Sequence, residues 1–258
     1  MNDSTTAKLP IFYSFRRCPF AMRARMALAY AQAPVEVREI ELGDKPAELV
    51  AISPKATVPV LQLADGTVIE ESLDIMRWAL DQYDPEEWQG IHKNLTAELI
   101  LANDTSFKKN LDRYKYHSET SEHPKEHYRE LAVEFLRHLE RCLGYNEGRG
   151  LVRGTPSFAD YAIFPFVRQF AGTDQAWFDA APFPLLQVWL TTRIRSDRFA
   201  QAMRKYPVWK SGEPGTVENW APIRATGPEG DQLVWTKAKP TKPAKAEPYK
   251  TKAKRKDA

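Results

Sequence analysis

The sequence contains only two cysteines in 258 residues, Cys18 and Cys142. This number excludes the disulfide framework of a small secreted domain, and it indicates a reducing compartment in which a free thiol can be reactive. No apolar run approaches the roughly 18 residues of a membrane-spanning helix, and residues 1–10 lack the basic and apolar stretches of a secretory signal. We therefore expect a cytoplasmic protein that has no membrane partner.

Motifs for several other chemistries are also missing. The sequence has no glycine-rich phosphate loop and no dinucleotide-binding fingerprint. His123 and His127 have the four-residue spacing of helical metal ligands, but Pro124 stands where a zinc protease carries its glutamate. Solvated histidines are the expected structure there, and we expect no metal site.

The positive charge is confined to one end of the chain. The net charge is +3, but residues 237–258 hold nine Lys and Arg against two acidic residues, so residues 1–236 carry −4. The body of the protein therefore gives no reason to expect nucleic-acid binding. Residues 237–258, rich in Lys, Pro and Ala, are expected to form a disordered basic tail, and a nucleic acid would bind only there.

The first 83 residues alternate between strand and helix patterns. Apolar or period-two segments predict strands, and segments dense in helix formers predict helices. The predicted strands are 9–15, 35–42, 58–63 and 67–69, and the predicted helices are 21–33, 45–50 and 71–82. In this β-α-β-α-β-β-α order, Asp65-Gly66 marks an antiparallel hairpin and the first two strands pair in parallel. A mixed four-stranded sheet with helices on its faces follows.

After Pro85 the sequence becomes helical. Helical spacing extends over 91–117, 124–143, 158–170 and 185–205. We therefore expect a linker over 84–90 and an all-α domain over 91–210. Residues 211–236, rich in Gly, Pro and Trp, are expected to be an irregular extension.

Cys18 lies where the first strand passes into the first helix. A thiol at a helix N-terminus faces unpaired amides whose partial positive charge favours the thiolate, and Arg16 and Arg17 add charge nearby. These neighbours predict a reactive thiol with a lowered pKa, although a lone cysteine is more often buried and inert. Ala21 stands where a redox pair would have its second cysteine, so Cys18 must act alone or with an external thiol.

Four motifs, in order along the chain, resemble the cytosolic glutathione S-transferase superfamily. They are Cys18-Pro19-Phe20-Ala21, Thr57-Val58-Pro59-Val60-Leu61, Glu71-Ser72-Leu73-Asp74-Ile75 and Thr155-Pro156-Ser157-Phe158-Ala159-Asp160. The first is similar to the cysteine-type, omega-like branch. The last resembles the capping box of a core helix, which the chemistry of Ser157 and Asp160 supports independently. The resemblance covers about residues 9–209 and implies a thioredoxin-like α/β domain over 1–83, followed by an all-α domain.

The resemblance implies glutathione as cosubstrate and assigns contacts for its cysteinyl part. The bond between Val58 and Pro59 would be cis, so that the Val58 backbone pairs with the cysteinyl group. Phe20 would complete this part of the site. The residues alone leave a trans bond open, since most bonds before proline are trans.

The resemblance also assigns the two ends of glutathione. Ser72 and the amides beside it would bind the γ-glutamyl carboxylate, as helix N-termini do, and Glu71 would bind the γ-glutamyl ammonium. Lys45 would pair with the glycyl carboxylate. On the residues alone, Ser72 could instead cap the helix, and Lys45 could be a solvated loop residue.

An electrophile pocket is expected beside the thiol, formed by Tyr13, Phe15 and Arg168. By resemblance Arg168 reaches this pocket, although a surface ion pair is the other interpretation. Tyrosine- and serine-type transferases use a hydroxyl at the end of the first strand, where Tyr13 and Ser14 lie. With Cys18 present, we expect these two hydroxyls to be structural.

A glutathione-dependent thiol transferase is the function that Cys18 and the resemblance together predict. Cys18 would attack a glutathionyl sulfur in a mixed disulfide, or act on dehydroascorbate, and a second glutathione would regenerate the thiolate. Two alternatives stay open: conjugation of glutathione to small electrophiles through Tyr13 or Ser14, and a non-catalytic protein that binds a partner. The physiological substrate and the oligomeric state, a homodimer among the candidates, also stay open.

Overall fold

The N-terminal part of the chain forms a mixed β-sheet. The structure is a computed structural model that describes residues 8–90 and 92–220. The strands are β1 (Ile11–Ser14), β2 (Val35–Glu39), β3 (Val60–Gln62), β4 (Val68–Ile69) and β5 (Thr216–Glu218), in the order β4-β3-β1-β2-β5. β1 pairs in parallel with β2 and antiparallel with β3, so that Phe12 lies opposite Val37 on one side and Leu61 on the other. The mixed sheet and its element order are confirmed, with one strand more than expected.

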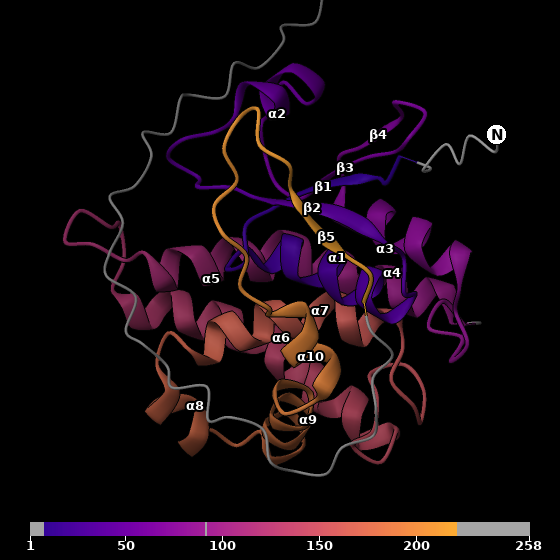
Figure 1. The fold of residues 1–258 in the computed structure, drawn as a ribbon. Helices are drawn as coiled ribbons and strands as arrows, with labels where there is room; N and C mark the ends of the chain where they lie inside the picture. The colour runs from indigo at the N-terminus through magenta and orange to yellow at the C-terminus, as the bar shows by residue number, and fades with distance from the viewer. Residues whose placement is uncertain (1–7, 91, 221–258) are drawn as a thin grey trace, which may run out of the picture. The chain divides into compact units, whose positions relative to one another are not determined.

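Three helices cover the two faces of this sheet. They are α1 (Pro19–Tyr30), α2 (Ala47–Ile52) and α3 (Ser72–Gln82). α1 and α3 pack together on one face, and α2 lies on the other (Figure 1). Because α1 also contacts helices of the C-terminal part, all its residues except Phe20 are buried. Burial on every side places Arg23 and Arg25 inside the protein, where each needs a partner.

The described residues from 92 to 205 are mainly helical, as expected for an all-α domain. The helices are α4 (Lys93–Ala102), α5 (Lys108–Lys115), α6 (Lys125–Tyr145), α7 (Phe158–Ala171), α8 (Gln175–Ala180), α9 (Pro184–Ile194) and α10 (Asp197–Ala202). A π-helical turn, η1 (Asn103–Phe107), joins α4 to α5. The helix expected over 185–205 is in fact two helices, because the hydroxyl of Ser196 accepts the amide of Phe199 and caps α10. Within the described ranges, no helix is both long and apolar enough to cross a membrane.

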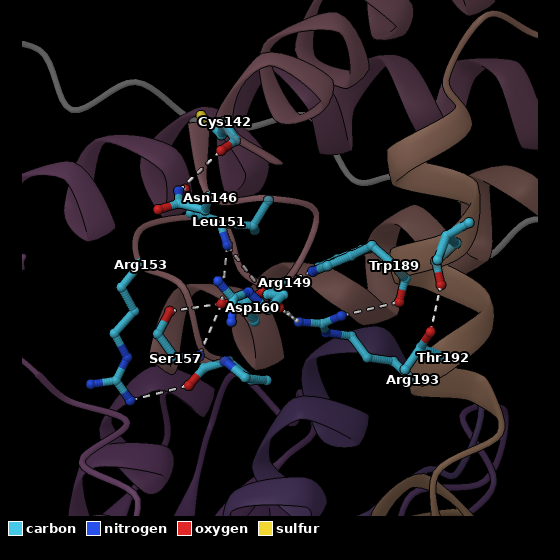
Figure 2. Close-up of polar contacts among 12 residues, drawn as sticks. Cys142, Asn146, Arg149, Leu151, Arg153, Ser157, Asp160, Trp189, Thr192 and Arg193 are labelled. Carbon is cyan, nitrogen blue, oxygen red and sulfur yellow. Dashed lines mark hydrogen bonds and ion pairs between the residues drawn. The ribbon is translucent and has the colours of Figure 1, made fainter. Parts of the chain in front are cut away.

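Asp160, near the start of α7, joins three parts of the helical domain (Figure 2). Its Oδ2 accepts the backbone N–H of Ser157 at 2.9 Å, which confirms the predicted capping box. Its Oδ1 accepts Trp189 Nε1 at 2.7 Å and the Arg193 guanidinium at 2.6 Å, both from α9. The amide of Leu151, in the loop before α7, donates to the same carboxylate at 3.2 Å. Asp160 is fully buried, and a buried charge needs a partner; Arg193 supplies it.

Residues 203–220, which we name the C-terminal strap, return from the helices to the sheet (Figure 1, orange). β5 lies in this strap and pairs antiparallel with β2, so that Thr216 lies opposite Val37. The expectation of an irregular extension over 211–236 is therefore wrong at residues 216–218. The three-residue strand has no alternating pattern of its own, and the open edge of β2 supplies its hydrogen bonds. The expected basic tail at 237–258, like residues 221–236, lies outside the described residues.

The strap also completes a second, smaller core between the sheet and α2. This α2-side cluster contains seven buried residues: Ile11, Tyr13, Ile40, Leu49, Val58, Val60 and Trp209. Trp209 comes from the strap and contacts the Tyr13 ring edge-on at 6.0 Å between centroids. Ser211 donates to the carboxylate of Glu48 in α2. The strap thus holds α2 against the sheet, beside the residues that the sequence assigns to the site.

Candidate active site

Cys18 occupies the N-cap position of α1 and is partly exposed. Its extended backbone and the Pro19 that follows start the helix, because proline fits the first helical position. The thiol donates to the carbonyl oxygen of Val58, with 3.6 Å between sulfur and oxygen. The bond from Val58 to Pro59 is cis, so the expectation from the resemblance is confirmed and the trans alternative is wrong. Two motifs 40 residues apart therefore meet at the sulfur.

The electrostatic balance at Cys18 differs from the sequence-based expectation. Burial raises the pKa of the thiol above its ordinary value, and this effect exceeds the lowering by the backbone amides of Ala21 and Phe20. The charges of Lys108 and Arg23 lower the pKa further but do not reverse the direction. The prediction of a lowered pKa is therefore wrong for the free protein. The sequence showed the helix N-terminus but not the protein packed around the sulfur.

The two arginines next to Cys18 also act differently from the expectation. Arg17 is exposed, and its guanidinium lies 5.3 Å from the centroid of the Phe15 ring. The backbone amide of Arg16 donates to Glu39 at the end of β2. The charges that lower the Cys18 pKa most come instead from Lys108 and Arg23, on α5 and α1.

In the free protein, the alkylation rate of Cys18 with iodoacetamide should rise with a midpoint above that of an ordinary thiol, roughly 8.5. Only the thiolate reacts, and burial keeps the thiol protonated to higher pH. Cys142 is 8% exposed and burial also raises its pKa, so it should react more slowly. The Cys142→Ser variant isolates the Cys18 signal. A midpoint well below 8.5 would show that amides and charges outweigh burial.

Ser72 lies at the start of α3, where it is buried against α1. Arg23 Nε donates to its hydroxyl oxygen at 3.0 Å. The same guanidinium donates two bonds, of 2.9 and 2.8 Å, to the carboxylate of Asp104 in η1. The N-cap of α3 is Glu71 rather than Ser72, so the capping interpretation of Ser72 is wrong. The hydroxyl is an acceptor toward Arg23, and its proton is left for another group.

Glu71 and Lys45 lie at the surface. The Glu71 carboxylate is exposed and lies 3.3 Å from the ammonium of Lys55. Lys45 is exposed in the loop before α2. Glu71 adjoins Ser72 and can share a ligand with it, whereas the assignment of Lys45 to the glycyl carboxylate stays a prediction.

The hydroxyls of Tyr13 and Ser14 are both held inside the protein. Tyr13 accepts from the Arg38 guanidinium at 2.8 Å, and burial raises the pKa of its phenol. Ser14 accepts from Arg25 Nε at 2.8 Å. Tyr13 is 1% exposed and Ser14 is fully buried. These contacts fit the structural role that we expect for both.

Aromatic rings from both parts of the chain meet beside Cys18. Phe20, on α1, contacts Phe166 of α7 edge-on at 4.9 Å between centroids. The guanidinium of Arg168, also on α7, lies 5.2 Å from the Phe199 ring. Burial and the charge of Arg16 lower the pKa of Arg168 to about 10. Arg168 is thus half-buried rather than part of the surface, while its role toward an electrophile stays a prediction.

Sequence reasoning missed the two cations that act on the thiol, Arg23 and Lys108, together with Asp104, the ion-pair partner of Arg23. Arg23 lies 5 residues after Cys18, and in the sequence it reads only as a residue that favours helix. Its contact with Asp104, 81 residues away, has no local signal. Asp104 and Lys108 are four residues apart, a helical spacing that suggests one face. Nothing in the sequence indicates that this face meets α1. No cluster of three or more metal-binding side chains occurs in the part of the chain that the structure describes.

Two family models match the chain. The one described as "Glutathione S-transferase, N-terminal domain" matches residues 12–87. The one described as "Glutathione S-transferase, C-terminal domain" matches residues 122–192. Together the two segments cover more than half of the chain, and they include the strand, thiol and capping-box motifs described above.

Known proteins are similar to the chain over part or most of its length. A pyrimidodiazepine synthase of Drosophila melanogaster is 38% identical over 74 residues, or 28% of this chain, so the match spans only 30% of that relative's length. A probable maleylacetoacetate isomerase 2 of the same organism is 24% identical over 230 residues, 86% of this chain and 95% of the relative. A glutathione transferase family member from Pseudomonas fluorescens, crystallised with two glutathione bound, aligns with a TM-score of 0.66 at 18% identity. The alignment covers 78% of this chain and 95% of that chain, and this likeness shows the fold.

Proposed function

Because this chain belongs to the glutathione S-transferase superfamily, we propose that it is a glutathione-dependent thiol transferase of the cysteine-type, omega-like branch. The observation that carries this proposal is the position of Cys18 at the N-terminus of α1. Its sulfur lies 3.6 Å from the carbonyl oxygen of Val58. A glutathionyl group bound along Val58 would present its sulfur to this thiol. The proposed substrates are mixed disulfides of glutathione, with dehydroascorbate as a further substrate of the same nucleophile.

The hydrogen bond of Cys18 offers a route from a protonated thiol to a nucleophile. In the free protein the thiol donates to the Val58 carbonyl, a contact that only the neutral thiol makes. We propose that the cysteinyl amide of a bound glutathionyl group takes this carbonyl as its own acceptor. The neutral thiol then loses its partner, while the amides of Phe20 and Ala21 still stabilise the thiolate. Substrate binding therefore favours the reactive form.

Ser72 is suited to the γ-glutamyl carboxylate. Its oxygen already accepts from Arg23, so its proton can be donated to a carboxylate oxygen. The N-terminal amides of α3 favour an anion at the same place. The Glu71 carboxylate, exposed next to Ser72, would take the γ-glutamyl ammonium. The glycyl carboxylate is assigned to Lys45, by resemblance alone.

The proposed cycle consists of two thiol–disulfide exchanges. The Cys18 thiolate attacks the glutathionyl sulfur, a Cys18–glutathione disulfide forms, and the substrate thiolate leaves and takes a proton from water. A second glutathione, as thiolate, then attacks this disulfide, which releases glutathione disulfide and restores the Cys18 thiolate. The departing thiolates carry the negative charge, so the cycle requires no dedicated general base.

Conjugation through Tyr13 or Ser14 is the less favoured function. A hydroxyl that stabilises a glutathione thiolate must reach the ligand, but Tyr13 packs in the α2-side cluster against Trp209 and Ser14 is fully buried beside the Arg25–Glu39 ion pair.

The experiment that tests the proposal is the intact mass of the protein after incubation with glutathione disulfide. The wild-type protein and the Cys142→Ser variant should each gain one glutathionyl group, which excess glutathione removes. Peptide mapping should place the group on Cys18. A protein that gains nothing, yet binds glutathione, would point to conjugation; one that neither reacts nor binds would point to the partner-binding alternative.

A further inference from the structure

Lys108, the first residue of α5, brings a positive charge from the helical domain close to Cys18. Its ammonium lies 5.9 Å from the centroid of the Phe20 ring, two residues after Cys18 along the chain. Its charge is one of the two that lower the Cys18 pKa. The side chain is 19% exposed, so most of it is covered, and its ammonium lies over the Phe20 ring.

The other cation that lowers the Cys18 pKa, Arg23, is already neutralised. Its guanidinium makes a two-bond ion pair with Asp104, and both side chains are largely buried, at 3% and 22% exposed. The partner of Lys108 is different. Asp112, four residues later on the same helix, is 42% exposed, and an ion pair at such a position is weak and screened by solvent. Of these two cations, Lys108 is therefore the one that an incoming anion can more readily recruit.

The π-helical turn explains why Lys108 reaches this place. η1 inserts an extra residue between α4 and α5, which rotates the following helix relative to the preceding one. As a result Asp104 meets Arg23, and Lys108, four residues on, lies over Phe20. Such turns are frequent at functional sites.

We propose that Lys108 is a specificity-determining residue that selects mixed disulfides whose leaving thiol carries a carboxylate close to the reacting sulfur. This inference rests on the proposed thiol transfer at Cys18. In the first exchange the leaving sulfur lies in line with the Cys18 and glutathionyl sulfurs, on the far side of the glutathionyl sulfur from Cys18, and the substituent of the leaving thiol is placed within reach of the Lys108 ammonium. An acidic thiol leaves there as a dianion of thiolate and carboxylate. The Lys108 ammonium attracts that charge, and the leaving thiolate still takes its proton from water.

The test compares three mixed disulfides of glutathione that differ only in the charge of the second thiol: mercaptoacetate, 2-mercaptoethanol and cysteamine. For each substrate, kcat/KM of a variant is divided by that of the wild type, so the intrinsic reactivity of the disulfide cancels. For Lys108→Met, this ratio should be about fivefold lower for the mercaptoacetate disulfide than for the 2-mercaptoethanol disulfide. For the cysteamine disulfide the ratio should be higher than for the 2-mercaptoethanol disulfide. Lys108→Arg should restore the wild-type order.

Matched variants separate charge recognition from structural damage. Lys109→Met removes the neighbouring exposed lysine and should leave the order of the three substrates unchanged. Asp112→Asn removes the counter-ion of Lys108 at a half-exposed position, and it should increase the preference for the mercaptoacetate disulfide. High salt should weaken the preference in the wild type.

The outcomes distinguish this inference from the function on which it rests. A wild-type protein that turns over none of the three disulfides contradicts thiol transfer itself. The role of Lys108 is overturned if Lys108→Met lowers kcat/KM by the same factor for all three disulfides. It is also overturned if Asp112→Asn leaves the preference for the mercaptoacetate disulfide unchanged. Either result leaves thiol transfer standing.

Discussion

Cys18→Ala should abolish turnover of the mixed disulfide between glutathione and 2-mercaptoethanol, a loss of at least about 10³-fold in kcat. Both half-reactions pass through a bond to the Cys18 sulfur, and no second cysteine is close enough to replace it. Cys142, on α6, is 8% exposed and lies in the helical core, so Cys142→Ala should retain wild-type activity. Steady-state assays of the two variants decide the result.

The same variant distinguishes the two chemistries. Conjugation to a chlorinated nitrobenzene requires glutathione itself to stay free as thiolate, and a Cys18 thiolate beside it would repel that charge and compete for the electrophile. We therefore expect weak conjugation by the wild type, with no decrease in Cys18→Ala. Conjugation that exceeds disulfide exchange in the wild type and falls in Cys18→Ala would overturn the proposed mechanism.

Asp160→Ala should lower the free energy of unfolding by about 3–5 kcal/mol. Arg193 is 6% exposed, and the substitution leaves its guanidinium without a counter-ion. It also removes the acceptor of Trp189 Nε1. It also breaks the capping box with Ser157 (Figure 2). An unpaired buried charge is the costliest of these losses, so Asp160→Asn, which keeps an acceptor but not the charge, should still be strongly destabilised.

Asp174→Ala is the matched control. Asp174 is also an aspartate at a helix N-terminus, where its carboxylate accepts the amide of Trp177 at 3.1 Å. Losing this single cap should cost about 1 kcal/mol. Urea unfolding, followed by tryptophan fluorescence and by circular dichroism, measures both variants. Equal losses at the two positions would mean that Asp160 acts only as a cap, and that its pairing with Arg193 adds nothing.

The fold could be predicted from the sequence where local pattern and chemistry agree. The strand before Cys18, the proline after it and the capping box at Ser157 and Asp160 are each specified within a few residues. It was the resemblance, rather than these local signals, that implied one glutathione site for the thiol and the Val58 backbone. Local signals of this kind also located the start of α3, although the capping residue proved to be Glu71.

What the sequence could not reveal depends on residues far apart in the chain. The direction of the Cys18 pKa follows from how tightly other segments cover the sulfur. The contact of Arg23 with Asp104 joins residues 81 positions apart, and β5 exists only because β2 offers an unpaired edge. In each case the decisive partner is chosen by the folded chain rather than by neighbouring residues.

The C-terminal strap has a consequence for how the protein is made. During synthesis the ribosome releases β1 to β4 long before residues 209–218, yet the sheet lacks its fifth strand and the α2-side cluster lacks Trp209 until those residues emerge. The amide of Gly215 bonds to Glu36 across 179 positions, among the most distant contacts in sequence. Such contacts are slow to form, because the loop they close is long. The nascent N-terminal part therefore spends most of its time on the ribosome with β2 as an open edge, a state in which chaperones and neighbouring nascent chains can pair with it.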